Sequence, residues 1–465
     1  MGPEPALSTP STRSTALLLV PPQSTATRTR SIAPTFRWTE CESRQWTARH
    51  RLQARHRFTP TCDHPASPTR RTDYARRVTA ATLVIVPLLA ALAPLITRSV
   101  RRWVAIPVIV FELLLGILVG PSVLGLLEPG SALDMLSEIG VAMLFFMAGT
   151  ELNASALRGR TGTRAWLGWF LSFAIGVAVG WVLVPGIGAV IIGIALSSTA
   201  LGTLIPVLRD NRELSTPFGH AVGAIGTVGE FGPIIAISVV LSHRSAIVAI
   251  LVLVVFAVVA LFAIWRAHRA EHGRLHRFVD ATLHTSAQFA IRLVLLIVAA
   301  LVALSAWLEV DILLGAFTAG IIWQLLIRDA SHDIQEAVES KIEGLAFGFL
   351  IPIFFIVTGI SFDLDALLEK PWTLALVPLV TLALFLVRGL PSALAAPEGS
   401  DRRTKLSVAL MGATGLPIII VATSTGVAEG YISATAAAVL VGGGMLSVLL
   451  FPATATLVRK PTAKA

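Results

Sequence analysis

The chain has 465 residues, of which 54% are hydrophobic and only 14% are charged, and its mean hydropathy is +0.76. Because a soluble globular protein carries roughly 25% charged residues, this composition excludes a large soluble enzyme and predicts a polytopic membrane protein. Residues 1–78 alone carry a net charge of +8, so the formal charge of +9 belongs to this tail. We therefore expect no nucleic-acid partner for the main body.

The basic tail over residues 1–78 is rich in Ser, Thr, Pro and Arg and lacks sustained apolar periodicity, which predicts disorder. Its composition also resembles that of an organelle transit peptide. We favour a third interpretation, in which the start codon is misassigned and the segment is not made. Both cysteines, Cys41 and Cys62, lie in this tail. The hydrophobic part therefore has no Cys-based metal site, and no cofactor is expected.

Thirteen apolar stretches follow from residue 79 onward, each close to the roughly 17–25 residues needed to cross a bilayer. The weakest is 79–96, which contains Pro87 and Pro94, so twelve spans are the alternative. The membrane domain is expected over 79–455, with a short C-terminal tail over 456–465. The predicted spans are 79–96, 104–126, 134–150, 165–183, 185–208, 216–242, 246–264, 286–307, 310–327, 341–362, 373–392, 404–428 and 433–455.

Loop charges predict the orientation. The connections after alternate spans, together with the C-terminus, carry 20 Lys and Arg residues, whereas the opposite connections carry only Arg244 and Lys370. This bias places the C-terminus in the cytoplasm of a cell-membrane protein.

An internal repeat is indicated by two sets of short matches. The segment 112–116 (Glu-Leu-Leu-Leu-Gly) is matched at 311–315 (Asp-Ile-Leu-Leu-Gly). One span further on, a Phe-Phe pair leads to Gly149 in the first unit and to Gly359 in the second. The two five-span units enter the membrane from opposite sides, which predicts the inverted repeat of many secondary transporters.

The fourth span of each unit is interrupted by small and helix-breaking residues. Matched interruptions in two halves predict broken helices that cross at a midplane ion site, because they free backbone groups and expose half-helix dipoles. The alternative is that these residues only allow close helix packing. The first span carries Ser198, Thr199, Gly202 and Pro206, and the second carries Gly412, Thr414, Gly415 and Pro417.

Few ionisable residues fall inside the predicted spans. Glu230 lies near the middle of its span, where a charge costs roughly 2.5–3.5 kcal/mol and usually has a functional reason. A buried carboxylate can hold a proton or a monovalent cation, and Arg388 could pair with it when no cation is bound. A static ion pair is the alternative. We assign Glu112, Glu138 and Arg292 structural roles, because they lie nearer the ends of their spans.

These motifs resemble the monovalent cation:proton antiporter-2 family, the bacterial sodium/proton exchanger fold, over roughly residues 80–455. The segments that carry the resemblance occur in the family's order. They are Leu113–Gly125, Glu138–Gly149, Ala195–Ala200, Leu314–Gly320 and Pro352–Gly359.

The resemblance implies a homodimeric exchanger in the lipid bilayer, with a scaffold domain and a core domain that moves in an elevator-like manner. It implies that Glu230 is the carrier carboxylate, that Ser198, Thr199 and Thr414 help to bind the cation or proton, and that Arg388 is the charge partner. In the family the acid usually follows Asp, Asn or Gln, whereas Gly229 precedes it here. A single carboxylate is typical of electroneutral exchange of one proton for one Na⁺ or K⁺.

Two other transport functions remain as alternatives. The segment Thr227-Val-Gly-Glu-Phe-Gly232 superficially resembles a potassium-channel filter, although it lies within a full apolar span. A symporter of a small organic anion is the second, although it would need more basic residues inside the membrane. A membrane enzyme is not favoured, because the hydrophobic part contains neither an HExxH motif nor a nucleophile elbow.

Overall fold

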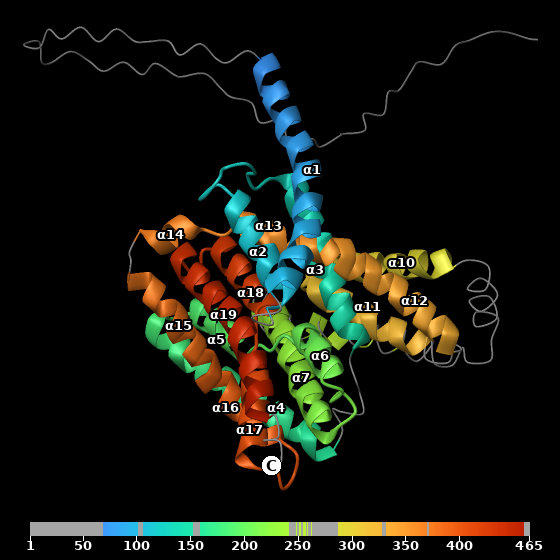
Figure 1. Ribbon diagram of the computed structural model, residues 1–465, viewed down its shortest axis with the longest axis vertical. Coiled ribbons are helices and arrows are strands. Elements are labelled where there is room, and N and C mark those ends of the chain that lie inside the picture. The colour runs from blue at the N-terminus through green and yellow to red at the C-terminus, as the bar shows by residue number, and fades with distance from the viewer. Residues whose placement is uncertain are drawn as a thin grey trace, which may run out of the picture. The chain divides into compact units, whose positions relative to one another are not determined.

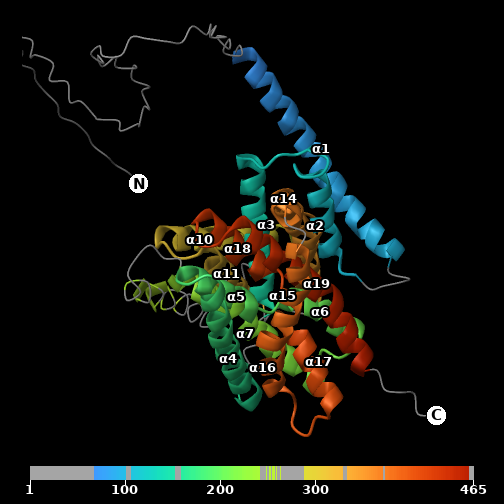
Figure 2. The ribbon, with the colours of Figure 1, turned by 90° about the vertical axis from the view of Figure 1, so that its left-hand side faces the viewer.

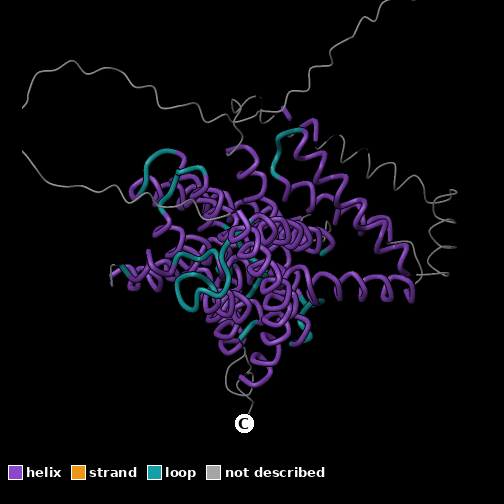
Figure 3. Tube along the Cα trace, turned by 90° about the horizontal axis from the view of Figure 1, so that it is seen from above, coloured by secondary structure: helices purple, strands orange, loops and turns teal. Residues whose placement is uncertain are grey.

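The computed structural model describes residues 68–100, 106–151, 159–240, 287–327, 332–369 and 372–459, together with scattered positions between 248 and 262. All of these belong to one compact unit, Ala66–Ala465. The tail up to residue 67 and most of the expected span at 246–264 lie outside the described residues. Every regular element in the described ranges is a helix, which confirms the all-α fold (Figure 3).

The helices pack into two groups. We call the first the scaffold group. Within it, α3 packs on α11 and α13, α2 packs on α13, and α1 packs along α2 (Figures 1 and 2). Its members are α1 (Pro68–Val100), α2 (Val108–Val119), α3 (Ser131–Thr150), α10 (Ala287–Trp307), α11 (Ile312–Ile327), α12 (His332–Leu345), the π-helix η2 (Ala346–Leu350) and α13 (Ile351–Ile360).

We call the second the core group. Here α4 packs on α5 and α7, while α19 packs on α15, α17 and α18 (Figure 1). Its members are α4 (Gly159–Leu183), α5 (Ile187–Ser197), α6 (Leu201–Asp210), α7 (Pro217–Val240), α14 (Leu364–Leu368), α15 (Trp372–Leu384), the π-helix η3 (Phe385–Gly389), α16 (Leu390–Ser392), the 3₁₀ helix η4 (Ala393–Ala395), α17 (Arg402–Gly412), α18 (Pro417–Ala428) and α19 (Ala434–Arg459).

Nine helical segments in the described part are long and apolar enough to cross a membrane. Three shorter apolar helices, Val108–Val119, Ile291–Trp307 and Ile312–Ile327, accompany them. The segment Thr82–Val100 belongs to the nine, although it includes the two prolines that weakened the prediction for 79–96. The structure therefore confirms a multi-pass helical protein and leaves the choice of twelve or thirteen spans as a prediction.

Two boundaries differ from those expected. The helix α1 begins at Pro68 rather than near residue 79, and α19 continues to Arg459 rather than ending near 455. In both helices the hydropathy pattern identified the apolar part. Polar or basic residues then continue the helix beyond that part. Hydropathy locates the part of a helix that lies in lipid, whereas the backbone hydrogen bonds continue beyond it.

Close glycine contacts join the two predicted repeats. A Cβ atom on Gly116 would lie 2.2 Å from the Ile356 carbonyl oxygen and 2.9 Å from the Cα of Gly359. A Cβ atom on Gly149 would lie 2.1 Å from the Phe317 carbonyl oxygen, with the Cα of Gly320 at 3.1 Å. The first helix of each unit thus touches the second helix of the other unit through a glycine pair. This reciprocal pairing is what a two-fold relation between the repeats predicts.

The two groups meet along a limited set of helices: α7 contacts α11, α6 contacts α3 and α19 contacts α2. Since α6 and α7 belong to the core group and α3 and α11 to the scaffold group, the residues between them lie at the boundary of the two groups.

Candidate ion-binding site

The first helix break separates α5 from α6. Ser198 and Ala200 have extended backbone conformations, with ψ angles of 154° and 91°, so the helical hydrogen-bond ladder stops here. The Ser198 hydroxyl donates to the carbonyl of Ala195 at 2.9 Å and satisfies a group near the end of α5. Gly202 and Pro206, which the sequence also associated with the break, lie inside α6.

The second break separates α17 from α18. The helix α17 ends at Gly412, and Leu416 leaves the helical region with φ −147° and ψ −55°. Pro417 then starts α18, where its missing N–H removes no hydrogen bond and its fixed φ suits a first turn. The Thr414 hydroxyl bonds back to the Leu410 carbonyl at 3.2 Å. Both breaks therefore combine a helix-ending sequence with hydroxyl groups that bond to nearby backbone.

The two breaks are joined by hydrogen bonds. The Ala200 N–H donates to the Thr414 carbonyl at 2.8 Å, and the Thr199 hydroxyl donates to the Gly412 carbonyl at 2.7 Å. These bonds link residues more than 200 positions apart in the chain. The predicted broken-helix residues of the two units are thus brought together at one crossing.

Glu230 on α7 faces this crossing. Its side chain is only 5% exposed, and its Oε1 accepts a hydrogen bond at 2.7 Å from the Leu201 N–H, the first residue of α6. The N-terminus of a helix favours a negative charge, so this contact stabilises the carboxylate. The second oxygen, Oε2, is buried and has no hydrogen-bond partner among the described residues. One oxygen of this buried carboxyl is therefore held by the start of α6, and the other has no hydrogen-bond partner among the described residues.

Arg388 contacts the first helix break through Thr199. It is completely buried on η3, where its Nε donates to Thr199 Oγ1 at 2.8 Å and its Nη2 donates to the Ile225 carbonyl at 2.8 Å. The structure shows no direct ion pair between Arg388 and Glu230. The two charges are instead connected through residues 199–201, since Thr199 holds the guanidinium and Leu201 holds the carboxylate.

The residue before Glu230 is Gly229, where the family usually has a polar residue, and the packing around it explains this difference. A Cβ atom at this position would lie 2.6 Å from Thr199 Oγ1 and 2.7 Å from Arg388 Nη2. The space that a polar side chain before the acid would need is thus taken by Arg388 and Thr199. The Thr199 N–H donates to the Gly229 carbonyl at 3.0 Å, so the backbone of α7 itself supports the break.

Ser447 on α19 is a site residue that the sequence analysis missed. Its fully buried hydroxyl accepts from the Gly415 N–H at 3.2 Å and lies 3.1 Å from the Gly415 carbonyl and 2.7 Å from the Gly444 carbonyl. It contacts the second break as Glu230 contacts the first.

Glu151, which follows the last residue of α3, was also missed. Its Oε2 is buried without a hydrogen-bond partner in the described part of the chain. Burial raises the pKa of this carboxyl to about 7, against the opposing effect of Arg209, while Glu343 raises it further. Its charge also acts on Glu230. An acidic group thus lies within electrostatic range of the crossing, beside the contact between α3 and α6.

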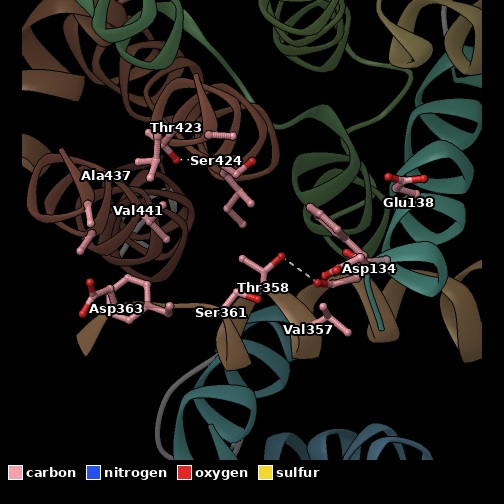
Figure 4. Close-up of a pocket in the computed structure, with 18 residues that line it drawn as sticks. Asp134, Glu138, Val357, Thr358, Ser361, Asp363, Thr423, Ser424, Ala437 and Val441 are labelled. Atoms are coloured by element: carbon pink, nitrogen blue, oxygen red, sulfur yellow. Dashed lines mark hydrogen bonds between the residues drawn. The ribbon is translucent and has the colours of Figure 1, made fainter. Parts of the chain in front are cut away.

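A cavity of about 460 Å³ lies between α3 and α13 of the scaffold group and α18 and α19 of the core group. Figure 4 shows Asp134 and Glu138 on α3 at one wall and Thr423 and Ser424 on α18 at the other. This cavity lies near the N-terminal end of α3, whereas Glu151 follows the C-terminal end of the same helix. Polar and acidic groups are therefore present near both ends of the boundary between the groups.

Known proteins resemble this chain over most of its length. YjbQ of Bacillus subtilis is 26% identical over 365 residues, a match that covers 74% of this chain and 58% of YjbQ, less than two thirds of that protein. The Na⁺/H⁺ antiporter NhaS4 of Synechocystis is 25% identical over 60% of this chain and 72% of its own length. The Na⁺/H⁺-K⁺ antiporter GerN of Bacillus cereus is 23% identical over 57% of this chain and 68% of its own.

The fold resembles that of the sodium proton antiporter MjNhaP1 from Methanocaldococcus jannaschii, with a TM-score of 0.58, 19% sequence identity and coverage of 80% of this chain and 96% of that one. The family model described as the transmembrane sodium/hydrogen exchanger matches residues 87–459. This match covers almost all of the described helices, and the family is one of transporters rather than enzymes. The chain belongs to the sodium/hydrogen exchanger family of multi-pass membrane proteins.

Proposed function

We propose that this protein is a secondary antiporter that exchanges a monovalent cation, Na⁺ or K⁺, for protons at Glu230 by alternating access. The observation that carries the proposal is the free Oε2 of this buried carboxyl at the crossing of two broken helices. A buried carboxylate costs free energy unless it is compensated, so it is completed by a proton or by a cation. Since one oxygen cannot readily hold both, the two ligands compete.

The surrounding residues suit this competition. Leu201 fixes Oε1 through its N–H, so that only Oε2 changes its ligand. Arg388 is held by Thr199 and Ile225 and supplies a fixed positive charge to the empty site. Among the predicted ligands, the Thr199 hydroxyl is already used by Arg388 and Gly412, which favours a positioning role for it. One carboxylate accepts one charge of either kind, which supports electroneutral exchange.

Movement of the core group against the scaffold group would expose Glu230 to each side in turn. In support of this, Glu230 lies on α7, which contacts α11 across the boundary, and acidic groups lie near both ends of that boundary. The names of the relatives support Na⁺ or K⁺ as the cation. The loop charges support a cell-membrane protein with a cytoplasmic C-terminus, and the family resemblance supports a homodimer.

The channel alternative loses its main support. The segment Thr227–Gly232 lies inside the continuous helix α7, Pro217–Val240. Helical carbonyls are engaged along the helix, whereas a potassium filter uses carbonyls that point freely into the pore. The organic-anion symporter is not favoured either, because Arg388 is fully buried and two of its three guanidinium nitrogens already donate to Thr199 and to the Ile225 carbonyl, although Nη1 has no partner among the described residues.

The test is transport in liposomes. The full chain and the variant Glu230→Gln are reconstituted with a trapped pH dye and an imposed pH gradient, and Na⁺ or K⁺ is then added. Proton movement evoked by the cation in the wild type, and lost in a folded variant, is the expected result. Exchange that continues at the wild-type rate in Glu230→Gln would overturn the mechanism. The more effective cation identifies the substrate.

A further inference from the structure

A second buried carboxyl lies away from the ion-binding site, in the scaffold group. Glu112 on α2 is only 3% exposed, and its Oε2 is buried without a hydrogen-bond partner in the described ranges. The sequence analysis gave this residue a structural role. A structural carboxyl of this kind is expected to be hydrogen-bonded, because a buried unpaired polar group costs about 1–3 kcal/mol. No described residue therefore supplies the partner that a structural role predicts, which leaves this carboxyl available to a ligand.

Glu112 lines a cavity of about 460 Å³ between α1, α2 and the η2–α13 segment. Thr97 and Arg98, in the last turn of α1, line the same cavity. Glu112 and Arg98 form no ion pair with each other, although both contribute to its wall. The cavity thus presents one acidic and one basic group that remain available to a ligand of mixed charge.

The local backbone keeps this space open. The segment Ala346–Leu350 is a π-helix, and this rare form often occurs at functional sites. Gly348 within it lines the cavity, and a Cβ atom at this position would meet no atom within 4 Å. A larger side chain would project into the open space, so glycine leaves room here.

The flanks of the cavity are apolar and exposed. Phe347, which also lines it, is 42% exposed, and Leu95 on α1 is 60% exposed. Large apolar side chains exposed on a membrane-spanning bundle face lipid. Arg98 lies at the end of an apolar helix, the level at which basic side chains reach the lipid headgroups. Figure 2 shows α1 running obliquely along the outside of the bundle beside α2.

We propose that this cavity binds the headgroup of a phosphatidylethanolamine molecule, with its ammonium group on Glu112 and its phosphate on Arg98. A primary ammonium has three N–H donors and can give a charge-assisted hydrogen bond to the carboxylate of Glu112, which lines the cavity. The phosphate accepts from the guanidinium, and the acyl chains lie against the exposed Phe347 and Leu95. Phosphatidylcholine has the same charges but no N–H donor, so it satisfies Glu112 poorly. The site is independent of exchange at Glu230.

The test is selective lipid retention by the detergent-purified full chain, measured by native mass spectrometry after incubation with equal amounts of dioleoyl phosphatidylethanolamine and dioleoyl phosphatidylcholine. Wild type is expected to retain the ethanolamine lipid preferentially. Glu112→Gln and Arg98→Gln should each reduce its retention by about tenfold, since each removes a charge-assisted hydrogen bond. Glu138→Gln, at an exposed acid on α3, is the matched control and should retain it as wild type does.

Gly348→Leu provides a test that leaves both charges in place. It adds a large side chain to the cavity lining at a position where a Cβ atom meets nothing within 4 Å, so the protein should fold while retention of the ethanolamine lipid falls. This variant and Arg98→Gln keep the proposal testable if Glu112→Gln does not fold. Equal retention of the two lipids by wild type would overturn the proposal. Wild-type retention in folded Glu112→Gln, or in both other variants, would do the same.

Discussion

The hydroxyl of Thr199 holds Arg388: it accepts a 2.8 Å hydrogen bond from the guanidinium Nε and donates a 2.7 Å bond to the Gly412 carbonyl. A single side chain in the first helix break thereby connects the fully buried cation to the second break. The crossing is organised by this connection and not by a direct pair between Arg388 and Glu230. Its strength can be measured by removing the hydroxyl.

Thr199→Val should therefore destabilise the protein strongly. The change keeps the shape of the side chain but leaves the buried Nε of Arg388 without an acceptor, which costs about 2–3 kcal/mol. Thermal unfolding in detergent measures the loss. Thr199→Ser keeps the hydroxyl and should recover most of the stability. If the Thr199→Val and Thr199→Ser proteins are equally stable, the hydroxyl of Thr199 does not hold Arg388.

Gly229 and Gly202 offer a matched pair of glycine substitutions. Gly229→Ala should cost about 1–3 kcal/mol, because its Cβ would lie within 2.7 Å of both Thr199 and Arg388. Gly202→Ala should fold as wild type does, since a Cβ atom there would meet nothing within 4 Å. Thermal unfolding of the two variants checks the difference. If Gly229→Ala is as stable as wild type, the space beside Arg388 can adjust.

Sequence patterns predicted the helical membrane fold because apolar length and small-residue motifs are local properties of the chain. The same motifs correctly indicated interruptions in both fourth spans. The sequence could not separate the break at Ser198–Ala200 from the nearby Gly202 and Pro206, since all of these residues disfavour helix and only tertiary contacts choose among them.

The partners of the buried groups depend on contacts between distant residues. The scarcity of charges inside the spans and the family resemblance predict that Arg388 pairs with Glu230, but the acceptors that hold it are Thr199 and the Ile225 carbonyl. Every residue has a backbone carbonyl, so the sequence does not indicate which carbonyl accepts a hydrogen bond from Arg388. Ser447 was missed for a similar reason: one serine in a small-residue helix is common, and its role becomes visible only beside the second break.

Ser447→Ala tests that role. The substitution leaves the Gly415 N–H, buried in the second break, without its acceptor, so we expect a loss of about 1–3 kcal/mol and slower exchange. Ser424→Ala on α18 is the control: Ser424 is exposed and bonds only to its own helix, so the change should stay within about 0.5 kcal/mol. Thermal unfolding and the liposome assay provide the two measurements. Wild-type behaviour of Ser447→Ala in both would remove Ser447 from the site.

Glu151 makes the stability of the protein depend on pH. Burial raises the pKa of its carboxyl from 4.5 to about 7, so the folded state keeps this proton over a pH range in which the unfolded state has lost it. A group of this kind lowers stability as the pH rises from 4.5 to 7, and the loss is complete above 7.

Glu151→Gln removes this proton linkage. The variant should gain stability relative to wild type as the pH rises through that window, by about 2 kcal/mol once partial exposure is allowed for. Thermal unfolding of both proteins between pH 5 and 8 measures the difference. Asp134→Asn, which removes an exposed acid at the other end of α3, controls for the loss of one negative charge. If the difference between wild type and Glu151→Gln is the same at every pH, the carboxyl of Glu151 does not titrate in this range.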